Sequence, residues 1–84
     1  MNLVRLRYFA SLREALGAAE EVVCEPGFTL GQLRDQLIER GGRHAEVLAR
    51  GRALRCALNQ VMADEATAVP AGAEVAFFPP VTGG

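Results

Sequence analysis

Residues 74–84 read EVAFFPPVTGG and decide how the rest of the sequence is interpreted. The first five alternate as in a strand, with Val75 and Phe77 on one face and Ala76 and Phe78 on the other. The two prolines that follow remove backbone donors and fix φ, so neither a sheet nor a helix continues past them. We therefore expect a strand that ends at an exposed Phe78, with Phe77 in the core and a tail that leaves the domain.

The tail ends in two glycines, whose lack of a Cβ makes a chain thin enough to enter a narrow cleft on another protein. The carboxylate of Gly84 is a poor electrophile because its charge is delocalised and water is a poor leaving group. Adenylation by a partner that uses ATP would activate it, and a sulfur or nitrogen nucleophile could then displace AMP. A terminus without chemical function is the alternative, but the pairing of FFPP with a glycine doublet favours the chemical role.

The composition describes one small globular domain. Half of the 84 residues are hydrophobic and the formal net charge is −1, so the chain has no polybasic stripe for nucleic acid or an anionic membrane surface. The opening residues, MNLVRLRYF, alternate polar and apolar and resemble neither a signal peptide nor a membrane span. We therefore expect a cytoplasmic protein with no nucleic-acid or membrane partner.

Reactive side chains are few. All nine basic residues are arginine, so no lysine is available to accept an isopeptide bond, and an activated tail would act as a donor. Cys24 and Cys56 are interpreted as buried thiols rather than as a disulfide or metal ligands. His44 stands alone and is interpreted as a surface residue. We predict no metal site and no bound cofactor.

Alternation of apolar and polar residues predicts the other strands. Residues 3–8 and 20–25 are expected to pair as an antiparallel hairpin with a wide loop, and residues 54–59 to form a strand that turns at Asn59-Gln60 into a short segment at 61–62. A type I turn is expected at residues 69–72, before the last strand. The inward residues of the first two strands are predicted to be Val4, Leu6, Tyr8, Val22 and Cys24.

Two capping boxes predict two helices. Ser11 with Glu14 indicates a short helix that ends at Gly17, and Thr29 with Gln32 indicates a longer one that ends at Gly41-Gly42. Phe28 is placed to pack against the first turns of the longer helix, and a helical turn is expected near residues 47–48. The apolar stripe of the longer helix comprises Leu30, Leu33, Leu37 and Ile38, and its opposite face comprises Arg34, Asp35 and Glu39.

The order strand, short helix, strand, long helix and further strands predicts an α+β fold of the β-grasp kind, a mixed sheet with one principal helix packed across it. This order implies that the first and last strands pair in parallel, which would place the tail at the end of a central strand. The predicted division is a domain over residues 1–78 and an extended tail over residues 79–84.

Four stretches point to a known family: YFASLREALG (8–17), TLGQLRDQL (29–37), CALNQ (56–60) and above all EVAFFPPVTGG (74–84). Through them the chain resembles, over essentially its full length, the small subunits of molybdopterin synthase, which are ubiquitin-like sulfur carriers of the MoaD and ThiS type. The resemblance implies that an enzyme related to the ubiquitin-activating type uses ATP to adenylate the Gly84 carboxylate. A sulfur donor would then convert the adenylate to a thiocarboxylate.

The resemblance also implies a partner and a product. The tail would enter the large subunit of molybdopterin synthase, in a heterotetramer built on a dimer of large subunits, and deliver sulfur to cyclic pyranopterin monophosphate. This step would form the dithiolene of the molybdenum cofactor, so the chain would be a sulfur-donating subunit and no enzyme on its own. By this resemblance, Gly83 and Gly84 correspond to the reacting tail of the family. The residues that correspond to its partner-binding positions are Phe78, Pro79, Pro80, Val81, Thr82 and Arg13.

Two positions depart from the family pattern, Ala73 in place of an acidic residue and Leu58 in place of valine. The first could weaken recognition by the activating enzyme, and the second is expected to be accommodated in the core. Three alternative functions remain: a sulfur carrier for thiamine or another sulfur pathway, a ubiquitin-like protein modifier, and an interaction domain whose tail performs no chemistry.

Overall fold

Five strands and three helices make up residues 1–80, the part of the chain that the computed structural model describes. In chain order they are β1 (Asn2–Tyr8), α1 (Ala10–Leu16), β2 (Ala19–Cys24), α2 (Leu30–Glu39), α3 (Gly42–Val47), β3 (Arg55–Leu58), β4 (Val61–Ala63) and β5 (Glu74–Phe78). Within these residues, no helix has the length and apolar character needed to cross a bilayer.

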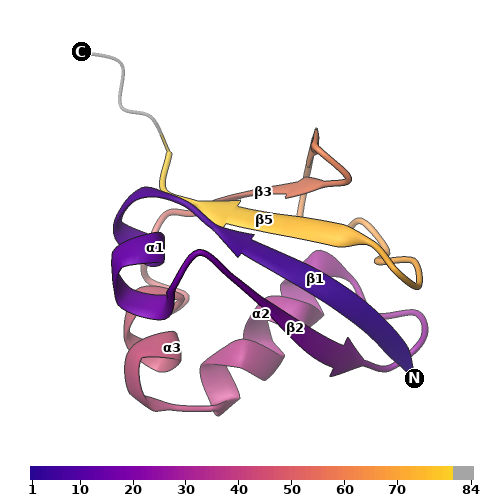
Figure 1. The fold of residues 1–84 in the computed structure, drawn as a ribbon, viewed down its shortest axis with the longest axis horizontal. Coiled ribbons are helices and arrows are strands. Elements are labelled where there is room, and N and C mark those ends of the chain that lie inside the picture. Colours follow the sequence, from indigo (N-terminus) through magenta and orange to yellow (C-terminus); the bar gives the residue numbers. More distant parts are fainter. Residues whose placement is uncertain (81–84) are drawn as a thin grey trace.

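The sheet has the strand order β2-β1-β5-β3-β4, so the last strand lies at its centre (Figure 1). Strand β5 runs parallel to β1, with Leu6 opposite Val75 and Tyr8 opposite Phe77, and antiparallel to β3. Strands β1 and β2 form the expected antiparallel pair. The predicted parallel pairing of the first and last strands is therefore confirmed, and with it the α+β, β-grasp arrangement.

The core lies between the sheet and the helices. Helices α2 and α3 lie on one face of the sheet, and α1 lies at the end toward which β1 and β5 run (Figure 1). Of the side chains that alternation assigned to this face, all but the half-buried Val22 are buried, and so are the leucines of the α2 stripe. At most 1% of the surface of each of these residues is exposed: Val4, Leu6, Tyr8, Cys24, Leu30, Leu33, Leu37, Val75 and Phe77.

Helix α2 begins as predicted. The Thr29 hydroxyl accepts a hydrogen bond from the Gln32 amide at 3.1 Å, and the Gln32 side-chain oxygen accepts one from the Thr29 amide at 2.9 Å. This reciprocal capping box satisfies two donors that the helix itself leaves free.

The expectation that Arg34 faces solvent is wrong, because its side chain is buried beneath α2. Its guanidinium donates to the carbonyls of Leu48, Ala49 and Arg52 at 2.7, 2.6 and 3.0 Å, and to the Glu65 carboxylate at 2.8 Å. The chain after α3 turns back along α2 and presents these carbonyls, and a planar guanidinium can satisfy several of them at once. The hydrophobic period of α2 contains no information about this loop.

Helix α1 does not use the capping box predicted for it. Its N-cap is Phe9, which makes no side-chain capping bond, and the amide of Leu12 donates to the Phe9 carbonyl at 3.1 Å. The chain passes from β1 into the helix through Ala10, whose φ is 53°, so Ser11 already lies inside the first turn. The helix ends at Gly17 as expected.

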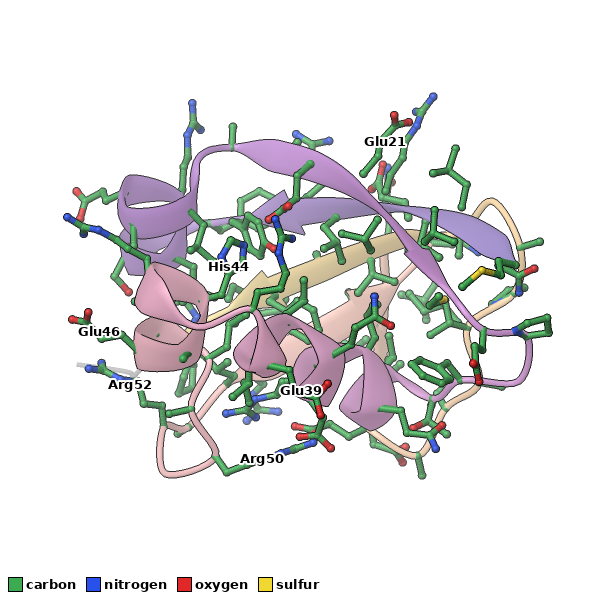
Figure 2. The ribbon with its side chains drawn as sticks, turned by 90° about the horizontal axis from the view of Figure 1, so that it is seen from below. Glu21, Glu39, His44, Glu46, Arg50 and Arg52 are labelled. Carbon is green, nitrogen blue, oxygen red and sulfur yellow. The ribbon has the colours of Figure 1, made fainter. Side chains whose placement is uncertain are left out.

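His44 is not an isolated surface residue. It points from α3 toward the sheet (Figure 2), and its Nε2 lies 2.8 Å from a carboxylate oxygen of Glu20 on β2. The Tyr8 hydroxyl donates to the same oxygen at 2.8 Å, and Arg40 donates to the other at 2.8 Å. Burial acts to raise the pKa of Glu20, but the bonds from His44, Arg40 and Tyr8 outweigh it and hold the pKa below its ordinary value. This carboxylate therefore joins the two strands to the helices.

The predicted turn before β4 is confirmed, whereas the turn before β5 differs from its prediction. Asn59 and Gln60 both have positive φ, 49° and 69°, which is the geometry of a type I′ hairpin turn at the predicted place. The Asn59 side-chain oxygen also accepts from the Glu74 amide at 3.0 Å, which ties this turn to the start of β5. Before β5, the Ala73 amide donates to the Pro70 carbonyl, so the turn spans residues 70–73, one residue later than predicted. Gly72, its third residue, has a φ of 75°, which fits type II and not the predicted type I.

The two departures from the family pattern lie in or against the core. Ala73 is 2% exposed, so it presents no side-chain surface to an activating enzyme. Leu58 is half-buried and packs on the core, as expected.

Candidate functional site

The candidate site is the place where β5 ends. The last paired residue, Phe78, is opposite Arg55 on β3, and Pro79 and Pro80 continue the chain out of the sheet. We call these three residues, 78–80, the tail root. Val81, Thr82, Gly83 and Gly84, which the sequence assigns to the tail, lie outside the described residues.

The prediction that Phe78 is exposed is only partly correct. Phe78 lies on the outer face of the sheet, as its alternation requires, but its side chain is half-buried. Its ring packs edge-on against that of Phe9, with the ring centroids 6.3 Å apart and the planes at 86°. The parallel pairing of β1 with β5 explains this contact, because it brings the residue after Tyr8 beside the residue after Phe77. Edge-to-face pairs of this kind are favourable.

A shallow apolar groove, lined by Phe9, Ala10, Phe78 and Pro79, opens beside the tail root. We call it the aromatic groove. Phe9 is 41% exposed there. Phe9 was not predicted as a site residue, although it directly follows the first strand and the predicted parallel pairing places that position beside the end of the last strand.

A second hollow also reaches Pro79, between α1 and the chain that leads into β3. It is lined by Ser11, Leu12, Val47, Arg52, Ala53, Leu54 and Pro79. The tail root therefore borders both an apolar groove and a mixed hollow that contains an arginine. Arg13, the predicted basic contact residue, is exposed on α1, at the end of the sheet where β5 also ends (Figure 1).

The cysteines take no part in this site. Cys24 and Cys56 are buried and unpaired, as predicted, and burial raises the pKa of both thiols. A protonated, buried thiol is a weak nucleophile, so neither is suited to relay sulfur. Among residues 1–80, no three side chains of histidine, cysteine, aspartate or glutamate gather as a metal site.

The geometry of the tail root is suited to holding the end of the chain out toward a partner. A central strand, held on both sides by its neighbours, directs the chain out of the sheet past an apolar contact surface. The aromatic groove contains no titratable side chain that could act as an acid or base.

Comparison with known proteins agrees with this geometry. A family model described as the ThiS family matches residues 6–84. A protein of Haemophilus influenzae named molybdopterin synthase sulfur carrier subunit is 36% identical over 83 residues, which cover 98% of this chain and all of that protein.

Two solved structures extend the comparison. The crystal structure of small archaeal modifier protein 1 from Haloferax volcanii superposes with a TM-score of 0.77 at 26% identity, covering 96% of this chain and all of that one. A chain in the complex of subunits 1 and 2 of the molybdopterin-converting factor from Helicobacter pylori superposes with a TM-score of 0.67 at 25% identity, covering 98% and 99%.

Proposed function

The chain belongs to the ThiS family, and we propose that within it the chain is the sulfur-carrier subunit of a molybdopterin synthase. The observation that carries the proposal is the central strand β5, which directs a tail ending in two glycines out of the sheet beside the aromatic groove. The full-length similarity to a protein named as such a carrier supports it.

The proposed chemistry takes place at the Gly84 carboxylate. An activating enzyme transfers AMP from ATP to one carboxylate oxygen and releases pyrophosphate. A hydrosulfide ion then attacks the carbonyl carbon, AMP leaves with that oxygen, the sulfur loses its proton, and a thiocarboxylate remains. The sulfur passes to cyclic pyranopterin monophosphate within the large subunit, and the carboxylate is regenerated with an oxygen that derives from water.

In this proposal the domain provides the docking surface and its partner provides the site of sulfur transfer. The folded domain offers the tail root and the aromatic groove as a docking surface, with Phe78, Pro79, Pro80 and Arg13 in contact with the partner. The residues beyond them, Val81 to Gly84, enter the partner's site. The large subunit supplies the pocket in which sulfur is transferred, and the similarity to a chain in a two-subunit complex supports such a partner. All of these steps would take place in the cytoplasm.

Intact mass spectrometry tests the proposal. The chain is incubated with ATP, the activating enzyme of the same organism and sulfide, and then with the large subunit and cyclic pyranopterin monophosphate. We expect a mass gain equal to the exchange of one oxygen for sulfur, which is lost only after the second addition. A variant that lacks Gly84 is the control and should show neither change while remaining folded. A thiocarboxylate that the large subunit does not discharge would contradict the role in molybdopterin synthesis.

A second candidate function is protein modification, which the similarity to a small archaeal modifier protein favours. It predicts that the activated Gly84 is consumed by lysine amines of other proteins, since this chain has none of its own. Conjugates of higher mass in the same incubation, supplemented with cell extract, would support that function. A thiazole-forming pathway would instead discharge the thiocarboxylate in the presence of a thiazole synthase.

The aromatic groove makes a prediction of its own. Phe78→Ala should weaken binding to the large subunit by at least about tenfold, because buried aromatic anchors often carry more than 1.4 kcal/mol of binding energy. It should also lower stability by about 1 kcal/mol, since the edge-on contact with Phe9 is lost. Val23→Ala, an exposed position on β2, is the matched control and should leave binding unchanged. Equal binding of both variants in a titration would exclude the groove as the docking surface.

A further inference from the structure

The nine arginines fall into two groups. Four form ion pairs with carboxylates: Arg5 with Glu21, Arg34 with Glu65, Arg40 with Glu20, and Arg50 with Asp35 and Glu65. The other five have no carboxylate of residues 1–80 within 4.0 Å, and they are Arg7, Arg13, Arg43, Arg52 and Arg55. The buried or multiply bonded pairs of Arg34, Arg40 and Arg50 link elements of the fold, whereas the exposed Arg5–Glu21 contact contributes little. The second group is available to bind something else.

Two arginines of the second group flank the aromatic pair on the outer face of the sheet. The guanidinium carbon of Arg7 lies 5.7 Å from the centroid of the Phe9 ring, and Arg55 on β3 is the cross-strand partner of Phe78. Both arginines are exposed. We call Arg7 and Arg55 the basic rim.

On this face, the neighbours of Arg7 on the adjacent strands are small. Arg7 is opposite Ala76 on β5, and Ala76 is opposite Ala57 on β3. Ala76 is half-buried and Ala57 is 8% exposed, so no large side chain follows Arg7 in this row, whereas Phe78 occupies the next row beside Arg55. A partner surface can therefore approach the sheet here while it contacts both arginines.

The same face of the sheet differs in charge at its other end. Arg5 lies between Glu21 and Glu74, which are its partners on β2 and β5, and its guanidinium is 3.9 Å from the Glu21 carboxylate. Two carboxylates oppose one guanidinium there, whereas the basic rim carries two positive charges without a counterion from residues 1–80. The charge on this face therefore changes along β5, from net negative near Glu74 to positive at the tail root.

From this arrangement we propose that the basic rim sets the orientation in which the domain docks, and that its partner protein presents carboxylates around an apolar site that receives the aromatic groove. The inference rests on the proposed function, because the partner is taken to be the large subunit. Arginine and aromatic side chains are the residues most enriched at the energetic centres of protein interfaces. Charges at the border of such a centre steer association and fix register more than they add affinity.

The chemistry of the surface favours a protein over a nucleic acid. Sequence-independent nucleic-acid binding relies on many phosphate contacts along a groove, whereas here two charges flank a compact apolar centre in a chain of net charge −1. Single-stranded RNA is therefore a competing ligand to be included in the test.

The experiment measures association of the chain with the purified large subunit of the same organism by stopped-flow fluorescence or surface plasmon resonance. The test variant is the double change Arg7→Gln with Arg55→Gln. The matched control, Arg5→Gln with Arg43→Gln, removes the same charge from exposed positions outside the rim. Salt is varied from about 0.01 M to about 1 M, which shortens the Debye length from about 30 Å to about 3 Å.

We expect the rim variant to associate about 5- to 20-fold more slowly than the unmodified chain at low salt, with the difference disappearing at high salt. The control should change the rate less than about twofold. Equal rates for the rim variant and the control would overturn the inference while leaving the proposed function intact. So would tighter binding of a 20-nucleotide RNA than of the large subunit, if the rim variant abolished it. If the unmodified chain does not bind the large subunit at all, the proposed function fails and the inference fails with it.

Discussion

At the scale of single residues, the main polar contributions to the fold come from side chains that bind several partners at once. Arg34 joins α2 to the chain that follows α3, and Glu20 joins β2 to α3 and the end of α2. Both are satisfied by hydrogen bonds, and no buried side-chain polar atom among residues 1–80 lacks a partner. A small domain buries a limited apolar surface, so such links between elements matter for its stability.

Arg34→Lys should destabilise the domain by about 2–3 kcal/mol, because lysine keeps the charge but cannot bond three carbonyls and a carboxylate in the geometry of a planar fork. Arg43→Lys, an exposed position on α3, is the charge-matched control and should change stability by less than about 0.5 kcal/mol. Urea unfolding followed by circular dichroism measures both. Similar midpoints for the two variants would show that the charge alone matters at residue 34.

Acid should unfold the protein partly through Glu65. Burial acts to raise the pKa of this carboxyl, but hydrogen bonds from Arg50 and Arg34 outweigh it and hold the pKa below its ordinary value of 4.5. The unfolded chain therefore takes up the proton first as the pH falls, so the stabilisation is complete above about pH 5 and is lost below it. Glu65→Gln should be less stable than the unmodified chain at about pH 7, and the difference should shrink toward about pH 3. A difference in unfolding free energy that stays constant with pH would contradict this prediction.

At the scale of elements, helices α1 and α2 begin in different ways, so substitutions at their first residues should affect stability differently. Helix α2 is capped by side chains that are adjacent in sequence, whereas α1 begins where β1 ends and takes its first bonds from the Phe9 carbonyl. The start of α1 is therefore set by the position of β1 in the sheet. This also places Phe9 beside Phe78 and builds the aromatic groove.

The two capping boxes provide a matched pair of variants. Thr29→Ala should cost about 1 kcal/mol of stability, because the Gln32 amide loses its acceptor. Ser11→Ala should cost less than about 0.5 kcal/mol, because Ser11 makes no capping bond at the start of α1. Thermal unfolding monitored by far-ultraviolet circular dichroism compares the two. A larger loss from Ser11→Ala would mean that α1 is capped by its side chain in solution.

At the scale of the whole molecule, the core and the proposed reactive end are separate. All the buried core residues lie between Val4 and Phe77, and the tail root begins at the next residue. The central position of β5 means that strands on both sides hold the tail root in place. The domain can therefore carry a chemical group into a partner without unfolding.

A chain that ends at Pro80 should fold as the full chain does. No core residue is removed, so we expect its unfolding temperature to lie within about 4 °C of that of the full chain, which corresponds to less than about 1 kcal/mol. The shortened chain should gain no sulfur in the mass assay. A clear loss of stability would show that residues 81–84 contribute to the fold, and the proposed division at residue 78 would then be incorrect.

The sequence by itself determined what depends on neighbours along the chain. The alternation of residues 74–78, the leucine spacing and capping box of α2, and the turn at Asn59-Gln60 all reflect local geometry, and each lies where it was predicted. The order of these elements was enough to predict the parallel pairing of β1 with β5 and the position of the tail root.

Only the tertiary structure decided which residues from distant parts of the chain meet. The burial of Arg34 depends on carbonyls 14 to 18 residues away, and the contact of His44 with Glu20 spans 24 residues. The contact of Phe9 with Phe78 joins the first and last strands. These contacts were not predicted because hydrophobic periodicity indicates which face of an element is buried but not what packs against that face. Phe9 could have been inferred from the predicted parallel pairing of β1 with β5, whereas Arg55 of the basic rim could be placed only once β3 lay beside β5.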